Sequence, residues 1–476
     1  MKKIVFSIIT LVLSVLFGCS SNAPAVSEND TNTSFSFTSS SGIPEVSSLL
    51  SHESILDIDF NDLNVSTEYI DQIKDKFPNC TISWLVPISG KRIKNDSAFL
   101  QLPELNKGDI ETLSYFEDLK VLDARGSAAV DELKDFSQKH PDCKVIWSET
   151  FYNRELSNYD TYIDLSNDSS VDYKGISTIL SEYTELKDVN LIGCNISNEE
   201  KKKLHETFPG ITFYWYVDFG NHIFKSTDTK LDFTTLLFHN LDEISIITGC
   251  FMHPEYVDLA SQGIENTDME KLCEEYPETK FVWMIRVGGL SVRTDSETFD
   301  GTQNRVKLRD FDIVNLKYCT NLKAINLNKQ QISDLTPLSS LKELRVLNIG
   351  GNNVSDISPI CNSLNLEYLS AYNNNISDIS CISSLLNLLD LNLSGNPVSD
   401  FGPIHKCKKL QYAHLSMTNC SDDSLQQDSI KAALPNTLFE FDEENFTRGW
   451  LNTEHSLIVE KIFASHKYLN LEDKGE

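Results

Sequence analysis

The sequence predicts an α/β solenoid, in which short parallel strands line a concave face and helices or turns cover the convex face. Three observations support this. Leucines recur every 22 residues near the C-terminal end, and a related, longer pattern recurs every 63 to 68 residues before them. Hydrophobic residues make up 40% of the chain, which is enough to bury a large core. Such periods are typical of coils that cannot bury their apolar residues alone and therefore stack on one another.

The composition describes an acidic, folded chain of 476 residues. It holds 41 Lys and Arg against 70 Asp and Glu, so its formal net charge is −29 at pH 7. So negative a chain repels the phosphates of nucleic acids and of anionic lipid headgroups, and neither is expected as a partner. Aromatic residues make up 10%, which excludes wholesale disorder.

The N-terminus is predicted to be an export signal followed by a lipid-attachment site. Two lysines precede an apolar run, residues 4–17, that is too short to cross a bilayer, since a spanning helix needs about 20 residues. The run ends in Leu-Phe-Gly-Cys, which resembles a bacterial lipobox with a phenylalanine where a small residue is usual. The resemblance implies that residues 1–18 are a signal peptide and that Cys19 carries a diacylglyceryl group. Residues 19–47 are rich in Ser, Thr and Asn, which favours a flexible tether.

Five coils of 22 residues are predicted over residues 322–420. Their leading leucines are Leu322, Leu344, Leu366, Leu388 and Leu410. Each begins a Leu-x-x-Leu-x-Leu strand, and the asparagine that follows is expected to turn the chain and to satisfy backbone groups along the stack. These asparagines are Asn352, Asn374 and Asn396, with Gln330 and Thr418 at the ends of the column. The pattern resembles the short leucine-rich repeats of bacterial internalin-type surface proteins, and it implies a horseshoe with a parallel concave sheet.

Residues 48–321 are predicted to hold four degenerate modules of 64 to 68 residues. Each has a helical stretch that ends at an aromatic-Pro or His-Pro pair, and then a strand with a tryptophan. The tryptophans are Trp84, Trp147, Trp215 and Trp283, and they are expected to point into the core. Ile58 and Ile325 are 267 residues apart, which is close to twelve coils of about 22 residues, or three per module. We therefore predict one continuous solenoid that mixes ribonuclease-inhibitor-like helical coils with tighter internalin-like ones; the alternative is four small α/β units in series.

Residues 421–476 are predicted to be the C-terminal cap. The segment 430–435 is typical of a helix stopped by proline, and apolar residues at helical spacing follow Trp450. A solenoid has to cover its last open coil, and this segment is the part of the chain left to do so.

Two further patterns concern cysteine and aspartate. Cys361 and Cys381 lie on adjacent coils, close enough for a disulfide, whereas Cys80 and Cys143 lie three coils apart and are expected to be buried thiols. The aspartates Asp334, Asp356, Asp378, Asp400 and Asp422 also recur every 22 residues. Stacked carboxylates can collect Ca²⁺, but turn capping is the interpretation that we favour. The sequence has no metal-ligand spacing, phosphate loop or catalytic motif, so no cofactor and no enzymatic activity are predicted.

The outward residues of the regular strands form a nearly uncharged strip, which we predict to be the contact surface. Its candidate ligand-binding residues are Tyr368, Tyr372, Asp390, Asn392, Tyr412 and His414. Tyrosine offers contact area and a hydroxyl, and it is enriched where binding energy concentrates. The alternative is that these residues are merely tolerated at an exposed face.

The predicted function is non-enzymatic binding. The chain is expected on the outer face of a bacterial cell membrane, anchored through Cys19, where its concave surface recognises a protein, peptide or glycan. An envelope-organising structural role is one alternative, and an unrecognised hydrolase is another.

Overall fold

The computed structural model describes residues 34–442 and 453–472. The predicted signal peptide, Cys19, the first part of the tether and Trp450 lie outside these residues. Within them, no helix combines the length and the apolar character needed to cross a membrane.

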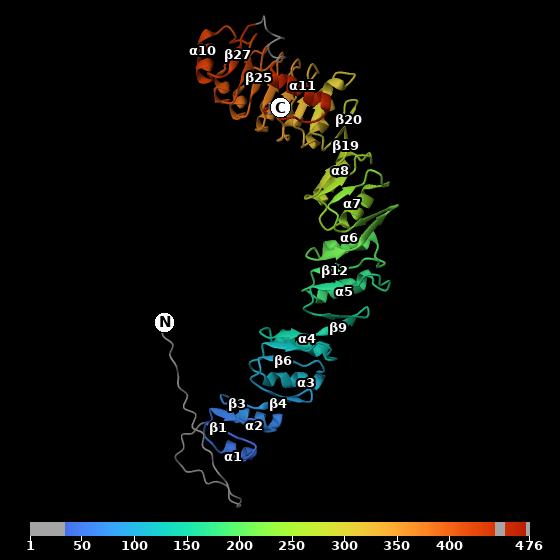
Figure 1. The fold of residues 1–476 in the computed structure, drawn as a ribbon, viewed down its shortest axis with the longest axis vertical. Coiled ribbons are helices and arrows are strands. Elements are labelled where there is room, and N and C mark those ends of the chain that lie inside the picture. Colours follow the sequence, from blue (N-terminus) through green and yellow to red (C-terminus); the bar gives the residue numbers. More distant parts are fainter. Residues whose placement is uncertain (1–33, 443–452, 473–476) are drawn as a thin grey trace, which may run out of the picture. The chain divides into compact units, whose positions relative to one another are not determined.

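The chain forms two compact units. The first contains the residues up to Asp160 together with residues 183–185, and the second contains residues 161–182 and everything from Leu186 onward. In both units, coils that carry a short strand and a helix follow one another along the chain (Figure 1).

The first unit holds two modules of the same construction: three parallel strands, one per coil, and then a β-hairpin. In the first module the parallel strands are β1 (Ser34–Ser36), β2 (Asp57–Asp59) and β3 (Thr81–Ser83), and the hairpin pairs β4 (Leu85–Ile88) with β5 (Lys91–Lys94). In the second they are β6 (Phe99–Gln101), β7 (Val121–Asp123) and β8 (Lys144–Ile146), with the hairpin β9 (Ser148–Phe151) and β10 (Arg154–Ser157). The helices are α1 (Val46–Leu50), α2 (Thr67–Lys76), α3 (Lys107–Thr112), the 3-10 helix η1 (Leu113–Tyr115) and α4 (Val130–Lys139).

The second unit begins with two more such modules. Their parallel strands are β11 (Tyr162–Asp164), β12 (Asp188–Asn190) and β13 (Thr212–Tyr214), then β16 (Lys230–Asp232), β17 (Tyr256–Asp258) and β18 (Lys280–Val282). Their hairpins pair β14 (Tyr216–Phe219) with β15 (His222–Lys225), and β19 (Met284–Val287) with β20 (Leu290–Arg293). The helices are α5 (Tyr173–Glu182), α6 (Asn198–Thr207), α7 (Leu241–Gly249) and α8 (Asn266–Glu275).

A seven-stranded parallel sheet, β21 to β27 in sequence order, completes the second unit. Its strands are β21 (Thr298–Asp300), β22 (Ala324–Asn326), β23 (Val346–Asn348), β24 (Tyr368–Ser370), β25 (Asp390–Asn392), β26 (Tyr412–His414) and β27 (Leu438–Glu440). The connections carry short helices: η2 (Gly301–Gln303), α9 (Asp310–Ile313), η3 (Val314–Tyr318), η4 (Thr336–Leu338), η5 (Ser358–Asn362), η6 (Ser380–Ser384), η7 (Gly402–Lys406) and α10 (Ser424–Ala433). Helix α11 (Glu454–Ser465) follows β27 in the sequence.

The solenoid of parallel strands that the sequence predicts is confirmed, with three coils per module, but its sheet is interrupted after the third coil of each module. After the third strand of each module the chain makes an antiparallel hairpin instead of another parallel strand. The hairpins turn through two residues with left-handed backbone, such as Ser89 and Gly90 (φ 49° and 68°) and Tyr152 and Asn153 (φ 50° and 58°). Two-residue turns of this kind match the twist of a hairpin. The modules therefore have separate sheets, but the first two share one hydrophobic core that runs from Leu49 to Val145, as expected of a solenoid.

The boundaries of the elements also differ from those predicted. Strand β1 lies inside the proposed tether and pairs with β2, so part of the range 19–47 is ordered sheet. The regular sheet begins at β21, one coil before residue 322. At the other end, α10 and β27 form a further coil that pairs with β26, and this coil is the part of the C-terminal segment that continues the stack.

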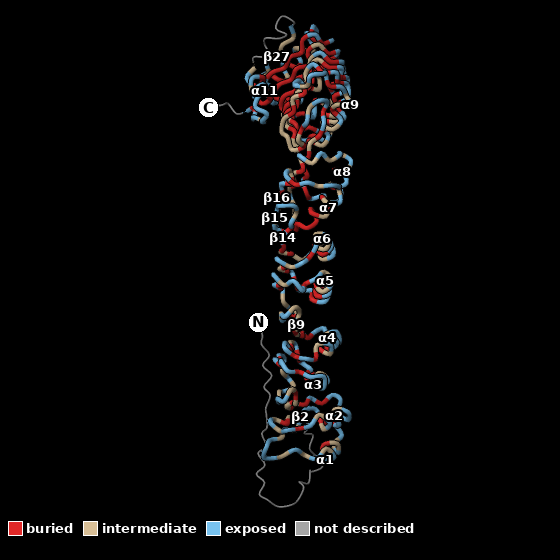
Figure 2. Tube along the Cα trace, turned by 90° about the vertical axis from the view of Figure 1, so that its right-hand side faces the viewer, coloured by how far each residue is buried: buried red, intermediate tan, exposed pale blue. Residues whose placement is uncertain are grey.

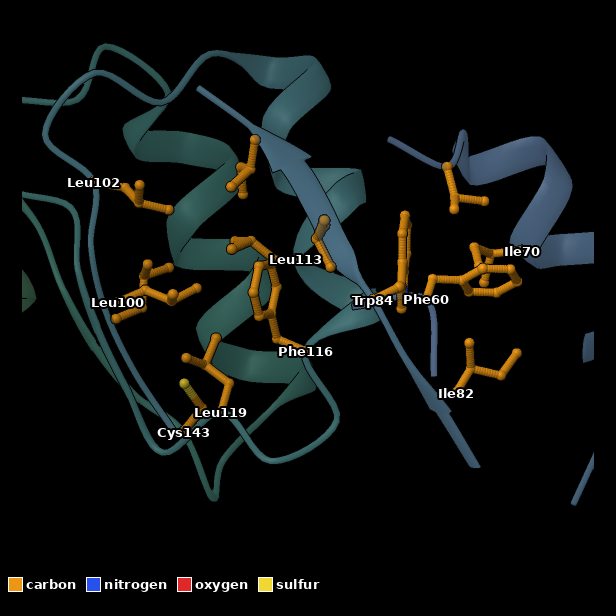
Figure 3. Packing of buried hydrophobic residues seen from close by; sticks show 14 of the residues in the cluster. Phe60, Ile70, Ile82, Trp84, Leu100, Leu102, Leu113, Phe116, Leu119 and Cys143 are labelled. Atoms are coloured by element: carbon orange, nitrogen blue, oxygen red, sulfur yellow. The ribbon is translucent and has the colours of Figure 1, made fainter. Parts of the chain in front are cut away.

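The tryptophans occupy the junction between the third strand and the hairpin of each module. Trp84 and Trp215 are buried, Trp283 is nearly so, and Trp147 is partly buried against the core of the first unit. Figure 3 shows Trp84 between Phe60 on one side and Leu113 on the other. The predicted inward orientation is therefore confirmed for these junctions. In the regular repeats, the strands are almost entirely buried (Figure 2).

The asparagine column links neighbouring coils through hydrogen bonds, as predicted. The Asn374 amide donates to the carbonyl of Ala371 in its own coil (3.1 Å) and to that of Ile349 in the preceding coil (2.9 Å). Its Oδ1 accepts the backbone N–H of Val354 at 2.9 Å. Asn352 and Asn396 make the same set of bonds.

The aspartate ladder caps turns, which confirms the favoured interpretation. Asp334, Asp356, Asp378 and Asp400 each accept the backbone N–H two residues ahead, at 2.7 to 2.8 Å. At the fifth position Asp423, not Asp422, makes the corresponding bond. Cys361 and Cys381 form a disulfide between adjacent coils. Cys80 and Cys143 are buried free thiols, as expected.

Candidate ligand-binding face of the regular repeats

The six residues predicted to bind a ligand lie on neighbouring coils of the seven-stranded sheet. Tyr368 is on β24, Asp390 and Asn392 are on β25, Tyr412 and His414 are on β26, and Tyr372 follows β24. The register pairs Tyr368 with Asp390, and Asp390 with Tyr412. The middle residue of each strand, such as Leu391, belongs to the solenoid core, so the flanking side chains point to the opposite face. The predicted columns are therefore present on one sheet face, which we call the concave strip.

The expectation that the concave strip is exposed is wrong. Tyr368 keeps 3% of its surface exposed, Asp390 1% and His414 none. Asn392 and Tyr412 are buried as well, and Tyr372 is half-buried. For Tyr368, Asp390 and Tyr412 the cause is the chain's own C-terminal segment, since α11 and the residues after it lie against these strands (Figure 1). The role that the sequence suggested for α11, a cap on the last coil, is therefore also wrong.

The contact between α11 and the concave strip is largely apolar. Val459, Ile462 and Phe463 of the helix, followed by Leu471, form one buried cluster with the sheet. The sheet residues in this cluster are Ala324, Val346, Tyr368, Leu389 and Tyr412. The helix residues fall at i, i+3 and i+4, the spacing that places side chains on one helical face. The cluster is separate from the interior of the coils and crosses strands β22 to β26.

Polar contacts fix the position of this helix at two places. At the N-terminal end of the helix, Nδ1 of His455 lies 3.0 Å from Oδ1 of Asp390. Beyond the helix, the hydroxyl of Tyr468 donates to Glu367 (3.1 Å), whose other oxygen accepts from Arg345 at 2.6 Å. The cations of Lys323 and Arg345 lie 5.7 and 5.8 Å from the centre of the Tyr468 ring. Such cation–π contacts favour this ring position.

Burial changes the acid–base behaviour of these groups. The hydrogen bond to the Asp390 carboxylate raises the pKa of His455. Burial raises the pKa of Asp390 itself, although His455 opposes this. Burial lowers the pKa of His414 and raises that of Tyr412, the latter with help from Glu440. Desolvation disfavours the charged form in each case, so the strip favours neutral or paired groups.

Tyr372 is held by contacts within the repeats. Its hydroxyl donates to Oδ1 of Asn328 at 2.7 Å. Its ring lies over Gly350, where a Cβ would come within 2.1 Å of the ring. Gly350 therefore makes room for the tyrosine ring.

The sequence reasoning missed the residues that bind α11. Arg345 and Glu367 precede their strands and lie outside the predicted columns, so the pattern gave them no role. The helical spacing in α11 was visible, but the pattern does not say which surface the helix covers. One signal was available: in so acidic a chain, a nearly uncharged sheet face indicates that something packs on it. Among the described residues, no group of three or more His, Cys, Asp or Glu is arranged to hold a metal ion.

The coils and their parallel strands define a leucine-rich-repeat solenoid. Residues 342–384 and 364–404 match the family model described as leucine-rich repeats in two copies. Proteins built from this repeat generally act by binding other proteins. No curated protein matches the sequence.

Three solved structures illustrate the likeness of fold. An internalin, InlF, of Listeria monocytogenes is 16% identical over 74% of this chain and 91% of its own, with a TM-score of 0.28. A second internalin of that species, InlC2, is 22% identical over 56% of this chain and 88% of its own, with a TM-score of 0.21. A leucine-rich-repeat protein of Leptospira interrogans is 14% identical over 84% of this chain and 93% of its own, with a TM-score of 0.26.

Proposed function

We propose that this chain is a lipid-anchored binding protein of the bacterial cell surface, with no catalytic role. Its concave strip recognises an amphipathic helix of a protein partner, and α11 occupies the strip until that partner displaces it. The residues that the sequence singled out, Tyr368, Tyr372, Asp390, Asn392, Tyr412 and His414, are then the receptor side of this contact.

The observation that carries the proposal is the seating of α11. The strip accepts one apolar helical face and offers a buried carboxylate, Asp390, to a cation on the helix. These are the elements of helix-in-groove recognition, in which apolar anchors at helical spacing supply contact area and a charged pair fixes the register. A glycan would fill this surface less well, because the area that α11 covers is mostly apolar.

Two features support a location outside the cytoplasm. The Cys361–Cys381 disulfide joins adjacent coils, and disulfides persist in oxidising compartments. The lipobox-like sequence at Cys19 supports the anchor, since two acyl chains hold a protein at a membrane more stably than one.

The test makes α11 removable. A protease site is inserted between Asp442 and Thr453, and a fluorescein-labelled peptide of residues 453–472 is titrated against the protein before and after cleavage. We expect the cleaved protein to bind the peptide at least tenfold more tightly than the uncleaved protein, because the covalently attached helix excludes it. Fluorescence anisotropy measures the binding.

A matched peptide carrying Ile462→Asp is the control, since it keeps the length and the cation at His455 but puts a charge on the apolar face. It should bind at least tenfold more weakly than the parent peptide. If the cleaved protein released its own C-terminal fragment, stayed folded by circular dichroism and bound neither peptide, the helix-receptor function would be wrong.

A further inference from the structure

A pocket lies where the last hairpin, β19–β20, meets the first coil of the regular repeats. The turn of the hairpin β19–β20 and the segment of residues 303–312 enclose a pocket of about 770 Å³. Ligand pockets commonly fall between about 300 and 1,000 Å³, so this one has room for several residues of a peptide. It lies apart from the residues that contact α11.

The pocket is held open by a fixed loop. The Asn304 side chain donates to the carbonyl of Val306 (2.8 Å) and accepts the N–H of Gly289 (3.2 Å), which ties the loop to the hairpin turn. Leu308 is fully buried, and its N–H donates to the Gln330 side chain at 2.8 Å. A binding surface that is already ordered loses little conformational entropy when a ligand binds.

The pocket concentrates positive charge in an otherwise acidic chain. Arg305, Lys307 and Arg309 line it within five residues of sequence, whereas the whole chain carries −29. In the described part of the chain, no ion pair joins any of these three side chains to a carboxylate. The one acidic residue in the lining is Asp312, whose carboxylate accepts the N–H of Arg309 at 2.8 Å.

Two apolar side chains stand beside these cations. Val306 keeps 69% of its surface exposed and Phe311 keeps 66%. The Arg309 guanidinium lies 6.0 Å from the centre of the Phe311 ring. A ligand that matches all of this lining carries carboxylates next to an aromatic or aliphatic group.

The first module shows a different solution at its own hairpin. There the N–H of Ser89 in the turn donates to the carboxylate of Asp109 at 2.9 Å. The nearby Lys107 is paired with Glu132 at 3.2 Å. The charges of Asp109 and Lys107 on α3 are thus used within the fold, whereas Lys91, Arg92 and Lys94 of the first hairpin are exposed and, among the described residues, line no comparable pocket.

We infer that this pocket, formed by the β19–β20 turn and residues 303–312, binds an acidic peptide segment that carries an apolar side chain. Its carboxylates contact Arg305, Lys307 and Arg309, and its apolar side chain packs against Val306 and Phe311. At physiological ionic strength the screening length is about 8 Å, so the distant negative charges of the chain repel such a peptide only weakly.

The test uses the full chain with α11 in place. The probe is fluorescein-labelled Asp-Glu-Phe-Asp-Glu, and binding is measured by anisotropy at 0.15 M salt, a condition on the order of the physiological one. We expect saturable binding that the triple variant R305Q/K307Q/R309Q weakens at least tenfold. The matched triple variant K91Q/R92Q/K94Q removes three exposed cations from the first hairpin and should bind as the parent does.

Two further comparisons separate the ligand classes. Phe311→Ala should weaken the Phe-containing probe and leave Asp-Glu-Ala-Asp-Glu unchanged, because that probe makes no ring contact. Inorganic polyphosphate should compete less well than the Phe-containing probe. Equal effects of the two triple variants, or stronger binding of polyphosphate than of the peptide, would overturn the assignment. The α11 exchange experiment reads a different surface, so either result stands without the other.

Discussion

His455 on α11 and Asp390 on β25 face each other across 3.0 Å in a contact that leaves Asp390 almost without solvent. The pair joins a helix near the C-terminal end to a strand 65 residues earlier. A buried charged pair contributes little net stability, but removing one partner is costly because the other charge stays buried. The pair therefore sets where α11 sits, while the apolar cluster supplies most of the contact area.

The seating of α11 should weaken as the pH rises. Docking raises the pKa of His455 above its ordinary value of 6.5, through Asp390 and the nearby carboxylates of Glu454 and Glu367. Burial also raises the pKa of Asp390 above its ordinary value of 3.8. Both groups hold protons more tightly when the helix is docked, so docking is favoured at low pH and is lost as the pH rises through the raised pKa of His455.

Hydrogen exchange in α11 measures this effect. Once corrected for the intrinsic rate, amide exchange of residues 454–465 should be faster at about pH 8.5 than at about pH 6. These conditions lie roughly two pH units above and about half a unit below the ordinary pKa of histidine. In the His455→Gln variant, the corrected exchange rate should no longer rise with pH above about pH 6, because no histidine titrates at this contact. An unchanged slope in this variant would contradict the assignment to His455.

A charge on the apolar face of α11 should release the helix. Ile462 is fully buried against the sheet, so Ile462→Asp places an unpaired carboxylate in an apolar cluster, at a cost of several kcal/mol. We expect α11 to exchange its amides as a free peptide does, with the circular dichroism of the repeats retained. Leu457→Asp, at a position that is 47% exposed on the same helix, is the matched control and should leave protection unchanged.

Loss of one asparagine of the column should destabilise the regular repeats strongly. Asn374→Ala leaves the buried N–H of Val354 unsatisfied, which costs about 1 to 3 kcal/mol, and removes one of the two hydrogen bonds to the carbonyl of Ile349. We expect the free energy of unfolding to fall by about 3 kcal/mol, measured by urea denaturation. Asn375→Ala, next in sequence and on an exposed turn, should change it by less than about 0.5 kcal/mol.

The disulfide should stabilise the repeats in the oxidised protein. Cys361 and Cys381 close a loop of 20 residues, for which the chain-entropy model gives about 3 kcal/mol. Replacing both with serine should lower the urea midpoint in the absence of reductant and remove its dependence on dithiothreitol. Cys273→Ser, at a free cysteine on α8, should keep that dependence.

The membrane anchor is tested separately from the fold. Cys19→Ser removes the thiol sulfur to which the predicted diacylglyceryl group is attached. Incorporation of radiolabelled palmitate should therefore be lost, and the protein should leave the membrane fraction. Label that persists in this variant would contradict the predicted attachment at Cys19.

The regular repeats were predictable because their chemistry is local. A coil of fixed length places its leucines, its asparagine and its turn-capping aspartate at fixed positions, and Leu344, Asn374 and Asp356 take the roles that spacing assigned them. The hairpins were missed because their strands are only four residues long, and some of them, such as Lys91–Lys94, are largely exposed. The pairs Ser89-Gly90 and Gly288-Gly289 were the available signal for two-residue hairpin turns.

The sequence predicts where the candidate site residues lie, but not that another segment of the chain covers them. Alternation within the strands located Tyr368, Asp390 and Tyr412 on one face, because the strand period is two. What covers that face depends on a contact between α11 and strands far away in sequence, and no periodicity within either segment encodes it. The pairing of His455 with Asp390 is of this kind.

The path of α11 changes how the regular sheet can unfold. In a repeat array each coil normally contacts only its neighbours, so coils can fray from either end one at a time. Here one segment reaches from Asp390 beside His455 to Lys323 beside Tyr468 and so bridges non-adjacent coils. Peeling off a single end coil would break contacts several coils away, which favours loss of the whole sheet in one cooperative step.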